Sequence, residues 1–210
     1  MDAAPLKEYL KAEGATLVGV GDVTMALSHE IVHLNRGIAL AVNMGLNRET
    51  LKLLVKLQSL ADIWLRAQGF RSLAIPPDSD RIKGKFITRL YKLFSHKTAA
   101  TCSGLGWIGK NGLIINERYG SKMSWATVLT NAPLEPDTAI TESKCGTCDL
   151  CIKHCPSGAV IGSTWSGEQP LMEMVHYEKC RSLKKKRRVF EAKPNCGLCI
   201  TICPYSRREM

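Results

Sequence analysis

Seven of the nine cysteines in this chain of 210 residues lie in two short runs close to its C-terminal end. The first run has the spacing Cys-x2-Cys-x2-Cys-x3-Cys-Pro and consists of Cys145, Cys148, Cys151, Cys155 and Pro156. The second run has the spacing Cys-x2-Cys-x3-Cys-Pro and consists of Cys196, Cys199, Cys203 and Pro204. The first spacing is typical of bacterial proteins with two iron–sulfur clusters, in which the fourth cysteine binds the other cluster. The runs therefore predict a small domain that holds two [4Fe–4S] clusters and moves electrons.

Each such cluster takes four thiolates, so two clusters need one cysteine more than the runs supply. A symmetrical second run would have it at position 193, where this chain has Lys193. We assign Cys180, which lies between the runs on a helix expected over 171–183. Cys102 is far upstream and is interpreted as a small buried apolar residue. The predicted ligands are Cys145, Cys148, Cys151 and Cys203 for cluster 1, and Cys155, Cys180, Cys196 and Cys199 for cluster 2. A seven-ligand arrangement with a three-iron cluster is the alternative.

Other uses of cysteine fit this pattern less well. Paired Cys-x2-Cys motifs also bind zinc, but a zinc site takes four ligands and the two Cys-Pro endings favour iron. A disulfide framework is disfavoured because nothing indicates secretion: the start of the chain has neither a basic segment nor an apolar one. No stretch approaches the ~18 apolar residues of a membrane span. We therefore expect a cytoplasmic protein with no membrane partner.

The formal net charge is +10, and much of the excess lies in the run Lys184 to Arg188. Bound clusters are anionic and would offset part of it. The run is either a solvated loop that balances the clusters or a docking surface. A docking surface of this charge would suit an acidic electron donor or RNA phosphates. The sequence leaves these alternatives open.

Upstream of the cysteine runs, alternating helix and strand patterns predict a layered α/β domain. The expected helices span 6–12, a long segment capped by Asn47 and closed by Gly69, and 85–94. The expected strands span 15–20, 37–42, 72–75, 112–115 and 124–129. A proline-punctuated connection at 132–137 follows. We predict one domain at 1–138 and a second at 139–210.

The segment from Gly104 to Asn111 is rich in glycine; it matches one nucleotide-binding pattern and nearly matches a second. A GxGxxG fingerprint must follow a strand and open a helix, but this segment follows an alanine-rich helical stretch and leads into a strand. The phosphate-binding pattern GxxxxGK[ST] fails at Asn111, where a hydroxyl is needed for Mg²⁺. The segment is either a tight turn around Trp107 or a surface that lets a large flat cofactor approach the backbone.

Three segments together with the order of the cysteines resemble epoxyqueuosine reductases. The segments are Ser95 to Ala100, Gly104 to Asn111, and Leu134 to Asp137 ahead of the cysteine runs. In the order of the cysteines, an isolated Cys180 lies between the two runs. The resemblance implies an α+β fold, with a nitroreductase-like α/β domain followed by a ferredoxin-like domain with two [4Fe–4S] clusters. In that family the clusters reduce a cobalamin, which reduces an epoxide on a modified tRNA nucleoside. Reductive dehalogenases are more distant relatives. We interpret the chain as a short form without the family's C-terminal helical repeats.

The family's catalytic acid lies in a Gly-Arg-Asp-Tyr-His motif that this chain lacks, so the catalytic residue is unassigned. His96 and Asp80 are candidates, against a hydrogen-bonded histidine and a turn aspartate. His29 and His33 have the spacing of a metal pair on a helix, but a structural role is favoured. The glycine-rich segment is expected to contact the cobalamin through Gly106, Trp107, Gly109, Lys110 and Asn111.

We therefore expect an iron–sulfur oxidoreductase that passes electrons through two clusters to a cobalamin in the first domain. A low-potential donor such as a flavodoxin or a ferredoxin would charge the clusters, and tRNA is a less favoured partner. The alternative is a ferredoxin-like electron-transfer protein that docks to a partner without a cobalamin of its own. The sequence identifies neither the substrate nor the oligomeric state.

Overall fold

The computed structural model describes residues 1–45, 47–77, 94–167, 174–190 and 196–207. The chain divides into two compact units. The sheet unit comprises Met1–Leu105 and Met123–Ile140, and the cluster unit comprises Gly106–Lys122 and Thr141–Met210. The segment 106–122 therefore belongs to the unit that carries the cysteine runs. The division into one domain at 1–138 and a second at 139–210 stays a prediction.

The sheet unit is built on four strands in the order β1-β2-β6-β3, and every neighbouring pair is antiparallel. The strands are β1 (Leu17–Asp22), β2 (Arg36–Val42), β3 (Ser72–Ile75) and β6 (Ser124–Thr130). Leu40 on β2 lies opposite Val18 on β1 and Ala126 on β6, so the most apolar strand is central. The strands predicted at 15–20, 37–42, 72–75 and 124–129 are confirmed, with small shifts at their ends.

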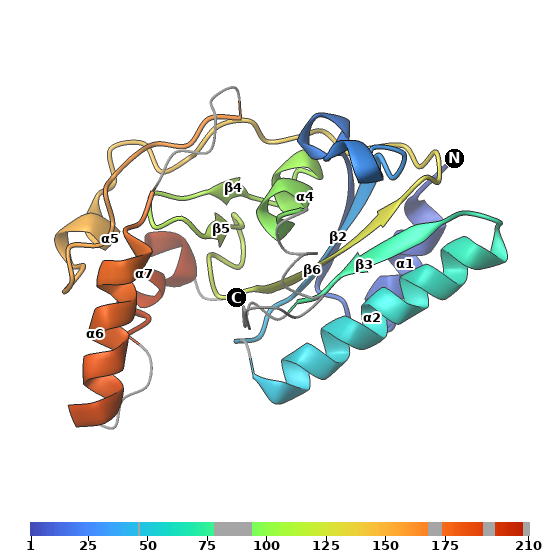
Figure 1. The fold of residues 1–210 in the computed structure, drawn as a ribbon. Helices are drawn as coiled ribbons and strands as arrows, with labels where there is room; N and C mark the ends of the chain where they lie inside the picture. Colours follow the sequence, from blue (N-terminus) through green and yellow to red (C-terminus); the bar gives the residue numbers. More distant parts are fainter. Residues whose placement is uncertain (46, 78–93, 168–173, 191–195, 208–210) are drawn as a thin grey trace. The chain divides into compact units, whose positions relative to one another are not determined.

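Helices cover both faces of this sheet (Figure 1). On one face, α1 (Ala4–Ala12) and α2 (Arg48–Ala67) pack on alternate strand residues such as Ile38 and Leu40. On the other face, α4 (His96–Cys102) packs near Ala39 and Leu129. The apolar core therefore lies on both sides of the sheet, and the predicted mixed α and β architecture is confirmed.

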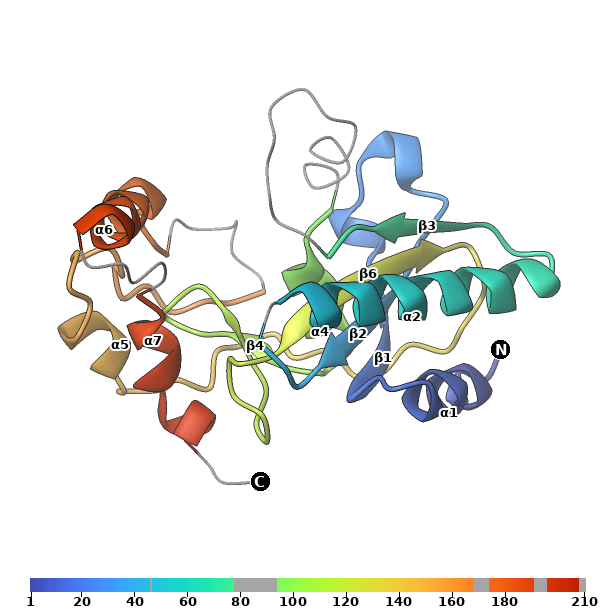
Figure 2. The same cartoon turned by 90° about the horizontal axis from the view of Figure 1, so that it is seen from below.

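The two long helical predictions have different outcomes. The helix capped by Asn47 is confirmed as α2, which lies along the sheet in Figure 2. The Asn47 side chain accepts a hydrogen bond from the Thr50 backbone N–H at 2.9 Å, and Gly69 follows the helix with a φ of +82°. The helix predicted at 85–94 lies outside the described residues except for Phe94, and Asp80 lies outside them too.

Glycine at position 21 lets α4 lie close to β1. A Cβ atom added to Gly21 would lie 2.6 Å from the Cβ of Cys102, closer than packed side chains allow. Cys102 is half-buried at the edge of this apolar cluster. Burial, and then the charge of Asp22, raise the pKa of its thiol. Cys102 therefore stays a neutral packing residue, in line with its interpretation from the sequence.

The cluster unit contains several short elements and one longer helix, joined by loops. They are β4 (Trp107–Ile108), β5 (Ile114–Ile115), α5 (Leu150–Lys153), α6 (Tyr177–Phe190), α7 (Leu198–Thr201) and the 3-10 helix η3 (Pro204–Arg207). The strand predicted at 112–115 is reduced to β5, which pairs with β4 in an antiparallel hairpin. We call residues 106–122 the hairpin segment.

Two predictions about α6 are wrong in detail. The helix predicted over 171–183 begins only at Tyr177, because Val175 forms an extended bridge with Val160. The run Lys184 to Arg188 lies within the helix and is not a loop. Lysine and arginine are good helix formers, so the run continues the helix that carries Cys180.

Two further features of the described residues bear on the sequence analysis. The 3-10 helix η2 (His29–Ile31) ends before His33, so the two histidines do not share one helix, and the metal pair that was already disfavoured lacks its helix. A second 3-10 helix, η1 (Thr24–Ala26), precedes it. None of the helices in the described ranges combines the length and the hydropathy that a membrane crossing requires.

Candidate metal centres

One cavity of the cluster unit is lined by cysteines from both runs. They are Cys145, Cys148, Cys151 and Cys203. The rest of the wall consists of Lys110, Asn111, Ile115, Leu150, Pro204 and Tyr205. This is the set predicted for cluster 1, in which the last cysteine of the second run joins the first three of the first run. The cavity brings these thiols together, and their role as ligands stays a prediction.

A second cavity is lined by the other four cysteines that the sequence singles out. They are Cys155, Cys180, Cys196 and Cys199. Cys180 reaches this cavity from α6, and Lys193, which holds the place of a cysteine in a symmetrical run, lies outside the described residues. The second cavity thus contains the set predicted for cluster 2.

The electrostatic interactions among the thiols follow the same division with one exception, because the charge of Cys199 in the second cavity also acts on Cys151 in the first. Burial, and then the charges of neighbouring cysteines, raise the pKa of Cys151 to about 11. Those neighbours are Cys145, Cys199, Cys148 and Cys203. Burial likewise raises the pKa of Cys199, and its neighbours are Cys180, Cys196 and Cys155. Thiolates this crowded repel one another, so a strongly positive group such as iron is needed to keep them ionised together.

Cys155 has a different environment from the other thiols. Burial alone would raise its pKa, but hydrogen bonds from Ser157 and from the backbone N–H groups of Val160 and Ala159 outweigh burial and lower it. The Ala159 N–H donates to the Cys155 Sγ at 3.2 Å. Donors of this kind stabilise an anionic sulfur, which suits a metal ligand.

The local backbone around the cysteines is alike in the two runs. A glycine follows the first cysteine of each run in the left-handed region, with φ of +51° at Gly146 and +58° at Gly197. Side chains rarely adopt this conformation, so glycine is favoured at both turns. A helix of one turn then carries a later cysteine of the run, Cys151 on α5 and Cys199 on α7. The short spacing thus turns several thiols toward one side.

The hairpin segment holds the cysteine loops from outside. The Lys110 Nζ donates to the carbonyl of Gly146 at 2.7 Å and to that of Cys148 at 3.1 Å. The Asn111 Nδ2 donates to the carbonyl of Cys199 at 3.1 Å. Sequence reasoning missed these contacts, because no local signal links a lysine or an asparagine to loops this far along the chain.

The other end of the hairpin segment holds the chain after the last cysteine. The Ser121 backbone N–H and its hydroxyl each lie 3.0 Å from the Ser206 Oγ. A Cβ on Gly120 would lie 2.5 Å from the Ser206 Cα, so only glycine fits there. Ser206 lies in η3, which begins directly after Cys203. The hairpin therefore fixes the position of that cysteine as well.

The glycines predicted to contact a cofactor lie against their own hairpin. A Cβ on Gly106 would meet the carbonyl oxygen of Ile115 at 2.5 Å, and one on Gly109 would meet the Ile115 Cδ1 at 2.3 Å. Trp107 is completely buried, and the Tyr205 ring packs edge-on against it with 4.9 Å between the ring centroids. These contacts account for the glycines as packing within the hairpin. A cofactor-binding role for Gly106, Trp107 and Gly109 stays a prediction.

The candidate catalytic histidine lies in the sheet unit. The His96 ring nitrogens lie 2.8 Å from the Thr127 Oγ1 and 2.9 Å from the carbonyl of Pro76. Because a carbonyl only accepts, the Nε2 carries the proton and the Nδ1 accepts from Thr127. Burial lowers the pKa of His96 to about 4, and the hydrogen bond to Pro76 only partly opposes this. His96 is therefore neutral near pH 7, and a role in catalysis stays a prediction.

Among the described residues, no three His, Cys, Asp or Glu side chains form a group that would hold a single metal ion. A single zinc ion draws its four ligands to one point. A four-iron cluster spreads its four thiolates over four irons. Each cavity lined by four cysteines offers the number of thiols that a four-iron cluster takes, and the assignment of these thiols as cluster ligands stays a prediction.

Comparison with known proteins identifies the cysteine-rich part of the chain. Residues 144–206 match the family model of a 4Fe-4S double cluster binding domain. The cluster unit contains a double [4Fe–4S] domain. The two [4Fe–4S] clusters predicted from the cysteine runs are thereby confirmed.

The resemblance to epoxyqueuosine reductases is also confirmed. The epoxyqueuosine reductase of Listeria monocytogenes is 34% identical over 114 residues, which cover 54% of this chain and 30% of that protein. The chain thus spans less than a third of this curated relative in the aligned part.

Solved structures extend the likeness to the fold. A crystal structure of epoxyqueuosine reductase with a modified tRNA-Tyr stem loop has a TM-score of 0.67 at 20% identity, covering 97% of this chain and 65% of that one. A reductive dehalogenase whose structure suggests a mechanism for B12-dependent dehalogenation has a TM-score of 0.67 at 16% identity, covering 97% and 32%. At these identities the likeness concerns the fold.

Proposed function

We propose that this chain is an iron–sulfur reductase of the epoxyqueuosine reductase type, in which two [4Fe–4S] clusters carry electrons to a cobalamin. The observation that carries the proposal is the pair of cavities, each lined by four cysteines, in a unit that matches a double-cluster domain. The ligand sets are those of the two cavities, with Cys180 as the eighth cysteine. We further propose that the sheet unit is nitroreductase-like and that the protein acts in the cytoplasm.

The role of this chain's own residues is to hold and insulate the clusters. The cysteines supply four thiolates to each cavity, and apolar side chains such as Leu150 and Ile115 keep water from the first one. In the second cavity, Val160 and Leu183 have the same role. Limited contact with solvent is one of the ways by which a protein sets a cluster's reduction potential.

A cobalamin would supply a low-potential metal for the reductive step, as the B12-dependent dehalogenase among the structural neighbours suggests. The residues predicted to contact it do not offer it an open surface. The space beside the Cα atoms of Gly106 and Gly109 is occupied by Ile115. Lys110 and Asn111 donate hydrogen bonds to the cysteine loops. The support for cobalamin is therefore the likeness of the whole fold, and we derive no step through it.

The proposed substrate is an epoxide on a modified tRNA nucleoside. It rests on the names of the relatives, of which one was crystallised with an epoxyqueuosine-modified tRNA stem loop. The chain covers 65% of the length of that crystallised protein.

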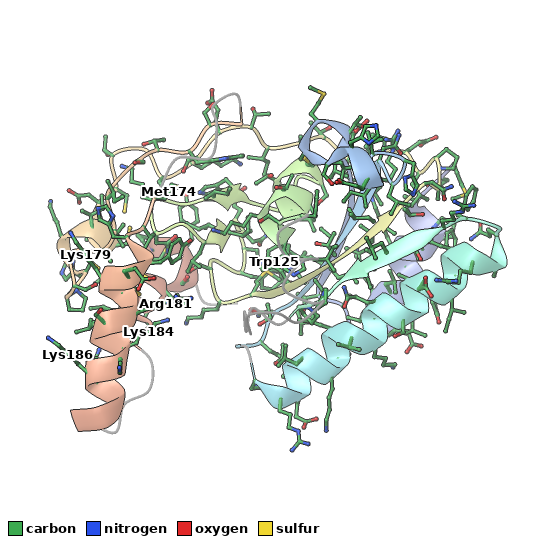
Figure 3. All side chains as sticks on the ribbon, viewed as in Figure 1. Trp125, Met174, Lys179, Arg181, Lys184 and Lys186 are labelled. Atoms are coloured by element: carbon green, nitrogen blue, oxygen red, sulfur yellow. The ribbon has the colours of Figure 1, made fainter. Side chains whose placement is uncertain are left out.

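We propose a small acidic electron carrier, a flavodoxin or a ferredoxin, as the donor. Lys179, Lys184 and Lys186 are exposed and lie on the helix that carries Cys180, as Figure 3 shows. Cys180 and Leu183 are less exposed and line the second cavity. A positive surface beside a cluster attracts an acidic protein and shortens the path of the electron.

A second candidate function is favoured by the packing of the glycine-rich segment. If Gly106 and Gly109 serve only the hairpin, the chain could pass electrons to a partner protein without a cobalamin of its own. The same clusters and the same basic helix would serve that role. The two functions differ in whether the chain retains a corrinoid.

One experiment separates the two functions. The full chain is reconstituted with iron and sulfide without oxygen, mixed with cobalamin and passed through a desalting column. The reductase proposal expects about eight irons per chain, from two four-iron clusters, and a retained corrinoid with an altered absorption spectrum. Eight irons without retained corrinoid favour the electron carrier. Zinc, or fewer than two clusters at full loading, contradicts both.

The reaction itself is tested next. The reconstituted chain with cobalamin and a reduced ferredoxin is given a tRNA stem loop that carries epoxyqueuosine. Conversion to the deoxygenated nucleoside supports the proposed substrate, and mass spectrometry of the digested RNA detects it. Retained corrinoid without conversion would contradict the tRNA substrate while leaving the reductase class intact.

A further inference from the structure

Lys110 places a positive charge beside the first cavity. Its ammonium is fixed there by the carbonyls of Gly146 and Cys148, at 2.7 and 3.1 Å, and it forms part of the cavity wall. Both carbonyls belong to the turn between the first two cysteines of the first run. Lys110 is half-buried, so water screens its charge less than that of an exposed lysine.

Asn111 lies between the two cavities. Among the described residues, it alone lines both of them. Its side chain is buried, its Nδ2 donates to the carbonyl of Cys199, and its Oδ1 accepts from the Leu113 N–H at 3.1 Å. The hydrogen bond to Leu113 fixes the amide, and the one to Cys199 ties the second run to the hairpin.

We infer that Lys110 and Asn111 are positioning residues of the electron path: Lys110 makes the first cluster the better electron acceptor, and Asn111 holds the two clusters in register. This inference rests on the proposed pair of [4Fe–4S] clusters. It gives the transfer a direction, from the cluster of the second cavity to that of the first.

The physical reason is the charge that reduction adds. With both clusters bound, transfer of one electron would oxidise the second from the 1+ to the 2+ state and reduce the first from 2+ to 1+, with no bond or proton moved. A nearby cation stabilises the more negative, reduced form and so raises the reduction potential. The second cavity also has a lysine in its wall, Lys184, but that residue is exposed on α6 and its charge is screened.

The charge of Lys110 is tested by a redox titration of the reconstituted full chain, followed by electron paramagnetic resonance. Lys110→Gln is expected to shift one of the two midpoint potentials to a more negative value and leave the other in place. Lys110→Arg keeps the charge and is expected to keep both potentials. Lys122→Gln, which removes an exposed lysine of the same hairpin segment, is the matched control.

Asn111 is tested by the same titration at pH 8. Asn111→Asp puts a negative charge at the wall of both cavities and is expected to lower both potentials, unlike Lys110→Gln. Asn111→Ala is expected to alter the magnetic interaction between the two reduced clusters, because the second run is no longer tied to the hairpin. Asn116→Ala is the control, since the Asn116 Oδ1 accepts from the backbone N–H groups of Arg118 and Tyr119 within the hairpin turn.

Each outcome decides the inference. Unmoved potentials in Lys110→Gln, or equal shifts with Lys122→Gln, overturn the role of Lys110. A shift of only one potential in Asn111→Asp overturns the position of Asn111 between the clusters. If Lys110→Gln assembles no clusters while Lys110→Arg assembles both, the positioning role is supported by iron content instead. Absence of clusters in the parent chain would contradict the proposed function itself, which iron and sulfide analysis reveals beforehand.

Discussion

The two units of this chain are stabilised in different ways. In the sheet unit, fully buried side chains such as Leu40, Leu57 and Leu129 form two apolar clusters on either side of a continuous sheet. Apart from α6, the cluster unit has short elements, a two-stranded hairpin and cysteines that are mostly half-buried. The comparison indicates that the first unit folds by burial of apolar surface, and that the second depends on its metal clusters.

The largest test of this difference is the removal of iron. Chelation of the reconstituted protein without oxygen is expected to unfold the cluster unit and leave the sheet unit folded, because thiols crowded in the cavities no longer share a cation. Hydrogen exchange with peptide-level mass spectrometry would show lost protection over 141–167 and 196–207, and retained protection in β1, β2 and β6. If the sheet lost its protection at the same degree of iron removal as the cluster unit, the two units would not differ in their dependence on iron.

The next test affects one cluster. Cys180→Ala is expected to remove about half of the iron, because only the second cavity loses a ligand. Cys102→Ala, the control, removes a cysteine that packs in the sheet unit and is expected to leave the iron content unchanged. Iron analysis and the absorbance of the clusters measure both variants. The opposite order of effects would show that Cys102 is the eighth ligand.

A third test concerns the sheet unit alone. The folded protein protonates His96 near pH 4, whereas the unfolded chain does so near pH 6.5. The unfolded state therefore binds more protons between these values, so stability is full above pH 6.5 and falls as the pH drops toward 4, by up to about 3 kcal/mol.

The measurement for His96 is the hydrogen exchange of β6 amides between pH 7 and pH 5, corrected for the intrinsic exchange rate. His96→Gln keeps a neutral donor and acceptor near Thr127 and Pro76 and is expected to flatten the pH dependence. An equal pH dependence in the parent and the variant would show that other groups cause it.

The smallest expected effect is at the start of α2. Asn47→Ala removes the hydrogen bond to the Thr50 N–H and is expected to lower the free energy of unfolding of the sheet unit by about 1 kcal/mol. Ser59→Ala, at an exposed site in the middle of the same helix, is the control. Urea unfolding followed by circular dichroism measures both, and iron content should not change in either variant. A change in iron content would couple the two units.

Much of the sheet unit could be predicted from local patterns. Strand positions followed from runs of apolar residues such as Ile38 to Val42, and α2 from its cap and its spacing of leucines. The predicted start of α6 was wrong because Val175 is held extended by a bridge to Val160, and a local helix pattern cannot reveal such a pairing. The helix propensity of lysine and arginine could have predicted that Lys184 to Arg188 are helical, but the run was interpreted by its charge instead.

The sequence by itself determined the chemistry of the protein. The spacing of the two cysteine runs and the single cysteine between them indicated two [4Fe–4S] clusters, because ligand type and short spacing are local properties. Only the tertiary structure decided what holds those runs together. Lys110 and Asn111 contact carbonyls 36, 38 and 88 residues further along the chain. Contacts over such separations depend on how the hairpin and the loops fold against each other, and no residue pattern near Gly106 or Gly109 encodes them.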